Sequence, residues 1–139
     1  MASDALFLAS AYAIALVSAT DQHHDVAVRL AADLRAKPLR LLTTRAILLE
    51  IGNALARPHW RTLGAELIAG LEADPRVEIR PLEDRLYHEG FELFRSRTDK
   101  GWSLTDGISF GLMSEQGLTE ALTSDPHFEQ AGFTALLSP

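Results

Sequence analysis

Three acidic residues stand where a short apolar run of the sequence gives way to a predicted helix: Glu50, Asp106 and Asp125. Carboxylates that come close together repel one another unless a cation neutralises them. A ligand set made only of oxygen atoms favours Mg²⁺ or Mn²⁺ over Zn²⁺. The three acids therefore suggest a divalent-metal site that acts on phosphate esters.

Each acid, taken singly, also has a structural interpretation. Glu50 lies beside an apolar helical arc, where it needs a partner such as a metal or an arginine, or else reaches water. Ser103 and Asp106 have the spacing of a capping box at a helix start. Asp125 followed by Pro126 is a common N-cap with proline at the first helical position. The metal hypothesis depends on these acids meeting in space.

The elements that position the acids alternate between short apolar strands and helices. Strands are predicted at residues 6–8, 39–42, 77–80, 119–123 and 133–136. Helices are predicted at residues 10–17, 22–36, 44–56, 60–73, 82–97 and 104–116, with a single turn at 126–130. Asp21 is expected to cap the second helix, Thr43 or Thr44 to cap the third, and Arg57-Pro58 to close the third.

This alternation is typical of an α/β domain with a mainly parallel sheet. In such sheets ligands bind beyond the carboxyl ends of the strands, which is where the acids are expected. The length of 139 residues and the lack of any long linker predict one domain over residues 1–139.

Composition limits the classes of function. A net charge of −6 excludes a protein that coats nucleic acid by bulk attraction, so contact with RNA or DNA needs a local basic patch or metal ions. The absence of cysteine excludes disulfides and thiolate metal sites, and it fits a protein of the reducing cytoplasm. The apolar run 5–19 is shorter than the roughly 20 residues that span a bilayer, and no lysine or arginine precedes it. We therefore expect a buried strand and helix there, and no membrane association.

Other catalytic classes find little support. The sequence contains no G-x-S-x-G, P-loop or G-x-G-x-x-G motif and no cysteine nucleophile. His127 is the one histidine near the expected site, but its spacing matches no zinc motif.

These residues, in this order, resemble the PIN domain, especially the VapC-like ribonuclease toxins of prokaryotic toxin–antitoxin pairs. The resemblance covers nearly the whole chain. Its pieces include Glu50-Ile-Gly-Asn-Ala-Leu55, Trp102-Ser-Leu-Thr-Asp106-Gly-Ile-Ser-Phe110 and Leu122-Thr-Ser-Asp125-Pro-His-Phe-Glu-Gln-Ala-Gly-Phe133, and the last two are fairly specific together. It implies a PIN-like three-layer α/β/α sandwich in which four acids gather around Mg²⁺ or Mn²⁺. The metal activates water for attack on an RNA phosphodiester.

By this resemblance, Glu50, Asp106 and Asp125 are expected to be three of the four catalytic, metal-binding acids, or residues that contact those ligands. Ser10, Thr105 and Ser124 are expected to support them: Ser10 by a hydrogen bond, the other two by orienting the acids. The resemblance also implies an RNA substrate, a cognate antitoxin protein and a homodimer. Apolar residues on the early helices fit a homodimer as well, among them Leu16, Val17, Leu30 and Leu34.

The sequence departs from the family at the first acid, because it reads Phe7-Leu8-Ala9 where the family pattern reads Phe-Leu-Asp. Asp4 lies about 16 Å away, at the opposite end of the strand, at ~3.3 Å per residue. Asp21 lies across a loop and is a poor substitute. Ala9 is either an engineered substitution that silences a nuclease or a natural change.

Two further functions stay open beside a weakened or silenced metal-dependent endoribonuclease. One is a non-catalytic PIN-like module that binds RNA or a partner protein. The alanine at position 9, where the family pattern has an aspartate, suggests this alternative. The other is a metal-dependent phosphohydrolase with a different substrate.

Overall fold

The structure is a computed structural model, and it describes residues 4–137. Over this range it contains the strands β1 (Ala5–Leu8), β2 (Arg40–Thr44), β3 (Val77–Arg80), β4 (Glu120–Leu122) and β5 (Thr134–Ala135). The helices are α1 (Ser10–Val17), α2 (His24–Arg35), α3 (Arg45–Ala54), α4 (Pro58–Ala73), α5 (Asp84–Ser96), α6 (Leu104–Gln116) and α7 (Pro126–Gln130).

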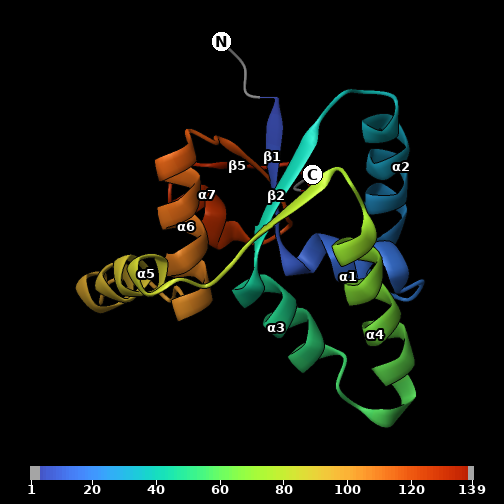
Figure 1. Cartoon of the computed structure of the whole chain (residues 1–139), viewed down its shortest axis with the longest axis horizontal. Coiled ribbons are helices and arrows are strands. Elements are labelled where there is room, and N and C mark those ends of the chain that lie inside the picture. Colours follow the sequence, from blue (N-terminus) through green and yellow to red (C-terminus); the bar gives the residue numbers. More distant parts are fainter. Residues whose placement is uncertain (1–3, 138–139) are drawn as a thin grey trace.

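The strands form one parallel sheet in the order β3-β2-β1-β4-β5. Phe7 of β1 pairs with Leu42 on one side and with Ala121 on the other, so β1 lies in the middle of the sheet. Figure 1 shows α1, α2 and α4 on one side of the sheet and α5, α6 and α7 on the other. The predicted three-layer α/β/α sandwich is therefore confirmed.

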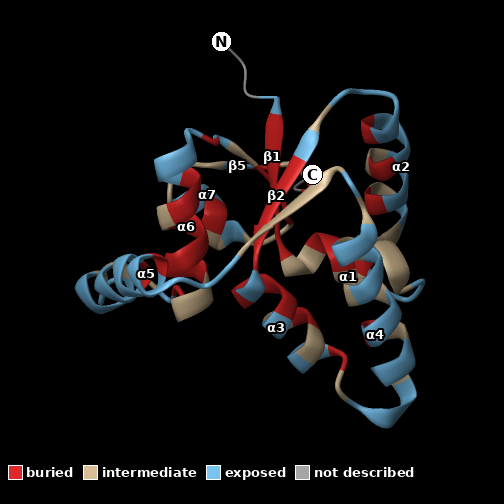
Figure 2. Cartoon of the chain, in the orientation of Figure 1, coloured by how far each residue is buried: buried red, intermediate tan, exposed pale blue. Residues whose placement is uncertain are grey.

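Burial explains why these short apolar runs form central strands. All four residues of β1 are buried, as are the last four of β2. A parallel strand covered on both faces needs an unbroken apolar run rather than an alternating one. Figure 2 shows this buried centre, with exposed residues on the outer surfaces of the helices.

The starts of α2, α4 and α5 each differ from the prediction by two residues, and α5 begins at Asp84 rather than at residue 82. Helix α2 begins at His24, because Asp21 Oδ1 accepts the His23 N–H at 2.8 Å in a turn that precedes the helix. Asp21 is therefore not the N-cap. Pro58 stands in the first turn of α4 and begins that helix rather than closing α3. Proline tolerates this position because its missing N–H would have no partner there. Thr44, one of the two threonines considered, is the N-cap of α3.

Helices α5 and α6 pack with almost no space between their backbones at two glycines. A Cβ on Gly107 would lie 2.5 Å from the carbonyl oxygen of Gly90. A Cβ on Gly90 would lie 2.7 Å from the backbone nitrogen of Ile108. Gly107 directly follows Asp106, so this contact fixes the helix turn that carries one of the acids.

The early helices are less exposed than the sequence suggested. Leu34 is buried, and Leu16 and Leu30 pack partly against the core, so these residues offer little free apolar surface for a dimer. Large exposed apolar residues lie elsewhere: Val28, Leu49, Leu82, Tyr87, Phe91 and Phe94. Within residues 4–137, none of the helices combines the length and apolar character needed to cross a membrane.

Candidate metal centre

The predicted acids come from three separate helices near the carboxyl-terminal end of the strands. Glu50 lies on α3, which follows β2 directly, and Asp125 is the N-cap of α7, just after β4. Asp106 lies in the first turn of α6. Because parallel strands end at a common edge, the carboxyl ends of β2 and β4 bring two of these segments to the same region.

Glu50 is partly buried and has a hydroxyl partner. Ser10 Oγ donates a hydrogen bond to Glu50 Oε1. Burial raises the pKa of Glu50 above its ordinary value, and the Ser10 hydrogen bond opposes that rise. The negative charges of Asp106 and Asp125 raise the pKa further. The three carboxylates therefore act on one another electrostatically.

Asp106 forms the capping box that its spacing predicted. Its Oδ2 accepts the Ser103 N–H at 2.9 Å, and its own N–H bonds to Ser103 Oγ at 3.0 Å. The side chain of Asp106 is only 11% exposed. The cap and the site interpretations are compatible, because the cap holds the carboxylate in a fixed orientation.

Asp125 is held by the start of α7. Its Oδ1 accepts the His127 N–H at 2.9 Å, and Pro126 follows it at the helix start. The Asp125 N–H donates to Thr123 Oγ1 at 3.1 Å. This hydroxyl, not that of Ser124, supports the Asp125 backbone.

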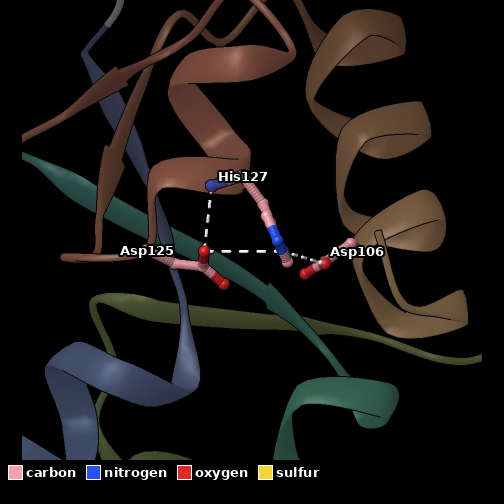
Figure 3. A group of neighbouring side chains, drawn as sticks. All are labelled: Asp106, Asp125 and His127. Carbon is pink, nitrogen blue, oxygen red and sulfur yellow. Dashed lines mark hydrogen bonds and ion pairs between the residues drawn. The ribbon is translucent and has the colours of Figure 1, made fainter. Parts of the chain in front are cut away.

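His127 lies between two of the acids, as Figure 3 shows. Its Nδ1 is 2.9 Å from Asp106 Oδ2 and 3.5 Å from Asp125 Oδ1. One ligand atom from each of the three residues lies within 4.8 Å of the others. His127 was not among the predicted site residues. The available signal was its place two residues after an aspartate N-cap, where the cap hydrogen bond draws that residue back toward the acid.

Ala9 is buried and stands at the carboxyl end of the central strand. Its N–H donates to Leu122 O at 3.3 Å. Side chains alternate along a strand, so Ala9 shares the face of Phe7, whose ring contacts that of Phe128 in α7. Asp4 is exposed at the start of β1, where its carbonyl accepts the Arg40 N–H. It therefore lies at the amino-terminal end of the strands, opposite to Ala9.

The expected supporting roles are met unevenly. Ser10 contacts Glu50, as described above. Within residues 4–137, no hydrogen bond joins the hydroxyl of Thr105 or Ser124 to any of the three acids. Thr105 instead lines an open groove of about 310 Å³ beside Glu50, together with Ala46, Leu49, Asn53, Leu82, Tyr87, Leu104 and Ile108.

The chemistry of this donor set fits a divalent cation. Metal–oxygen bonds of about 2.1 Å at right angles place neighbouring ligand atoms about 3 Å apart. The 2.9 Å between His127 Nδ1 and Asp106 Oδ2 is the distance of a hydrogen bond, and the same separation also suits two ligands of one ion. Glu50 and Asp125 supply further carboxylate oxygens in the same region.

Comparison with known proteins identifies similar chains. A family model for the PIN domain matches residues 6–134. The 23S rRNA-specific endonuclease VapC20 of Mycobacterium tuberculosis, in strains CDC 1551 and H37Rv, is 27% identical over 130 residues, which are 92% of this chain and 95% of the relative. The crystal structure of M. tuberculosis VapC20, described as a Sarcin-Ricin loop cleaving toxin, superposes with a TM-score of 0.83 at 26% identity, covering 92% of this chain and 95% of that one.

Proposed function

The chain belongs to the PIN-domain family and is similar to VapC-type toxin endonucleases, and on that premise we propose that it is a divalent-metal-dependent endoribonuclease scaffold of the toxin–antitoxin type. The observation that carries the proposal is the convergence of Asp106 and Asp125 at the carboxyl edge of the sheet. Glu50 lies within electrostatic reach of both. We propose these three acids as the catalytic, metal-binding set.

The residues of the chain hold this set in place before any ion binds. Ser10 orients Glu50, the capping box orients Asp106, and the start of α7 orients Asp125. A bound Mg²⁺ or Mn²⁺ would activate water and stabilise the charge that develops on the phosphodiester. Thr105, in the groove beside Glu50, and Ser124, beside Asp125, would orient the acids or the RNA backbone.

Ala9 weakens this site. The methyl group at the carboxyl end of β1 supplies no oxygen, so one carboxylate of the family's four is missing. Fewer charged donors bind a divalent ion less tightly. The chain as given should therefore cleave RNA slowly or not at all.

The test is the substitution Ala9→Asp, with Ala9→Asn as a neutral control of nearly the same shape. Each protein is incubated with a structured RNA oligonucleotide in Mg²⁺ and in Mn²⁺. Ala9→Asp should cleave at least about tenfold faster than the parent chain, and Ala9→Asn should not. A folded Ala9→Asp protein that binds metal yet leaves RNA intact in both ions would refute the endoribonuclease proposal.

The second candidate function is a non-catalytic module that binds RNA or a partner protein. The buried Ala9, in place of an acid, is the observation that favours it. RNA binding that is equal in the parent chain and in Ala9→Asp, with no cleavage by either, would support it. Hydrolysis of small phosphate esters without RNA cleavage would instead indicate a different metal-dependent phosphohydrolase.

We further propose partners and a location for the protein. The groove beside Glu50 is lined by Leu49, Leu82 and Tyr87 and gives an antitoxin segment an apolar surface that leads to the acids. The single PIN-like domain would pair as a homodimer, which mass measurement in solution across micromolar concentrations would test. An RNA target such as ribosomal RNA requires the protein to act in the cytoplasm.

A further inference from the structure

His127 is held rigidly beside the acids. Its backbone N–H is bonded to Asp125 Oδ1, and the next residue, Phe128, is buried against the rings of Phe7 and Phe110 at centroid distances of 6.1 and 5.0 Å. The imidazole is 30% exposed, so the surrounding chain leaves access to it from solvent. Its position follows from core packing and not from a flexible surface side chain.

The contacts of Nδ1 allow two interpretations. In the first, Nδ1 carries a proton and donates it to Asp106 Oδ2 in a hydrogen bond, which both a neutral and a charged imidazole can form. In the second, a neutral imidazole directs the Nδ1 lone pair at an ion that the two carboxylates share, and Nε2 carries the proton. The separations of 2.9 and 3.5 Å suit adjacent ligands around one metal, for which bonds of about 2.1 Å give about 3 to 3.5 Å.

The charge of the site favours the second interpretation once a metal is present. The two carboxylates and the nearby Glu50 attract a divalent cation. This attraction exceeds the repulsion of the cation by a single imidazolium charge. The missing acid at Ala9 also leaves the ion with only three carboxylates. A fourth donor from the protein would restore the number of ligands.

We propose that His127 Nδ1 is a metal ligand that compensates for Ala9, and that the resulting nitrogen-and-oxygen donor set selects Mn²⁺ or another first-row transition ion over Mg²⁺. This inference rests on the proposed metal-dependent function and specifies its site. Imidazole binds transition ions well, whereas Mg²⁺ prefers oxygen donors and an octahedral shell that retains several waters. The site then differs from an all-carboxylate centre in the ions that it accepts.

The experiment measures metal binding directly in the full chain without an affinity tag, so that no tag histidines bind the ion. Mn²⁺ and Mg²⁺ affinities are measured by titration calorimetry. Pulsed electron paramagnetic resonance of bound Mn²⁺ detects coupling to a ligand ¹⁴N nucleus. The variants are His127→Gln and, as a matched control, His59→Gln, because His59 is exposed on α4.

The parent chain and His59→Gln should both show ¹⁴N coupling to Mn²⁺, and His127→Gln should lose it. His127→Gln should also weaken Mn²⁺ binding by at least about tenfold, while its Mg²⁺ affinity changes by less than about threefold. Circular dichroism of His127→Gln establishes that the variant is folded. A folded His127→Gln with unchanged Mn²⁺ affinity, or a parent chain without ¹⁴N coupling, would overturn the inference.

Failure of this inference is distinguishable from failure of the proposed function. If Mn²⁺ binds through oxygen alone while Ala9→Asp cleaves RNA, only the role of His127 is wrong. If neither the parent chain nor Ala9→Asp binds Mn²⁺ or cleaves RNA, both the inference and the metal-dependent function are wrong.

Discussion

Replacing Gly107 by alanine should separate α6 from α5 and disturb the acid that precedes it. The added Cβ would lie 2.5 Å from Gly90 O, whereas ordinary contacts begin at 3.4 Å, so it falls 0.9 Å short. The obstacle is backbone and not the end of a flexible side chain, so a helix has to move. Overpacking of this kind costs about 1–3 kcal/mol.

Gly111 provides a matched control one turn further along the same helix. A Cβ on Gly111 meets nothing within 4 Å. Gly→Ala within a helix stabilises by up to about 1 kcal/mol when the site has room. Both variants share this gain, so the difference between them isolates the contact with α5. Gly107→Ala should be less stable than Gly111→Ala by about 1–3 kcal/mol, and a loss of 2 kcal/mol lowers the Tm by about 6–10 °C at this chain length.

The assay is urea unfolding followed by circular dichroism, with Mn²⁺ titration of each folded variant. Displacement of the first turns of α6 should weaken Mn²⁺ binding in Gly107→Ala and leave it unchanged in Gly111→Ala. Equal unfolding free energies for the two variants, within about 0.5 kcal/mol, would show that α5 and α6 are not in close contact at this point. The account of how Asp106 is positioned would then be wrong.

Two other substitutions test the electrostatics and the cap of the site. Burial, with the charges of Asp106 and Asp125, raises the pKa of Glu50. In metal-free protein Glu50 therefore contributes its full stability only below its unfolded pKa, near its ordinary value of 4.5, and loses that stability as the pH rises through the folded pKa. Glu50→Gln should thus gain stability relative to the parent as the pH rises from 4 to 8, and a pH-independent difference in thermal melting would contradict this. Ser103→Ala removes the hydrogen bond to the Asp106 N–H and should lower the free energy of unfolding in urea by about 1 kcal/mol. The control Ser114→Ala, at an exposed position of the same helix, should lower it by less than about 0.5 kcal/mol. Equal losses in the two variants would contradict the role of Ser103 as a cap.

Local signals in the sequence were sufficient for most elements of the fold. Helix α1 and strand β3 have the predicted bounds, because the apolar runs and their flanking residues determine them locally. The start of α2 was wrong, since an aspartate can close a turn before a helix as well as cap the helix itself. The helix boundary at Pro58 was wrong for a similar reason: proline ends one helix or begins the next with the same local preference.

The candidate site was predicted less completely than the fold. The three acids could be selected because their local contexts are distinctive. For His127 the local signal was its place two residues after the Asp125 cap, but its contact with Asp106 depends on how α6 and α7 pack, which no local pattern contains. Thr123 was also missed, although its bond to the Asp125 N–H is local. The resemblance implied a hydrogen bond from Ser10 without naming Glu50 as its acceptor.

The central place of β1 has a consequence for the protein during its synthesis. Its first neighbour, β2, follows early in translation, but β4 and the aspartate after it are made near the end of the chain. A nascent chain therefore keeps an incomplete sheet, with Asp125 not yet beside Asp106, until the segment that contains β4 has left the ribosome.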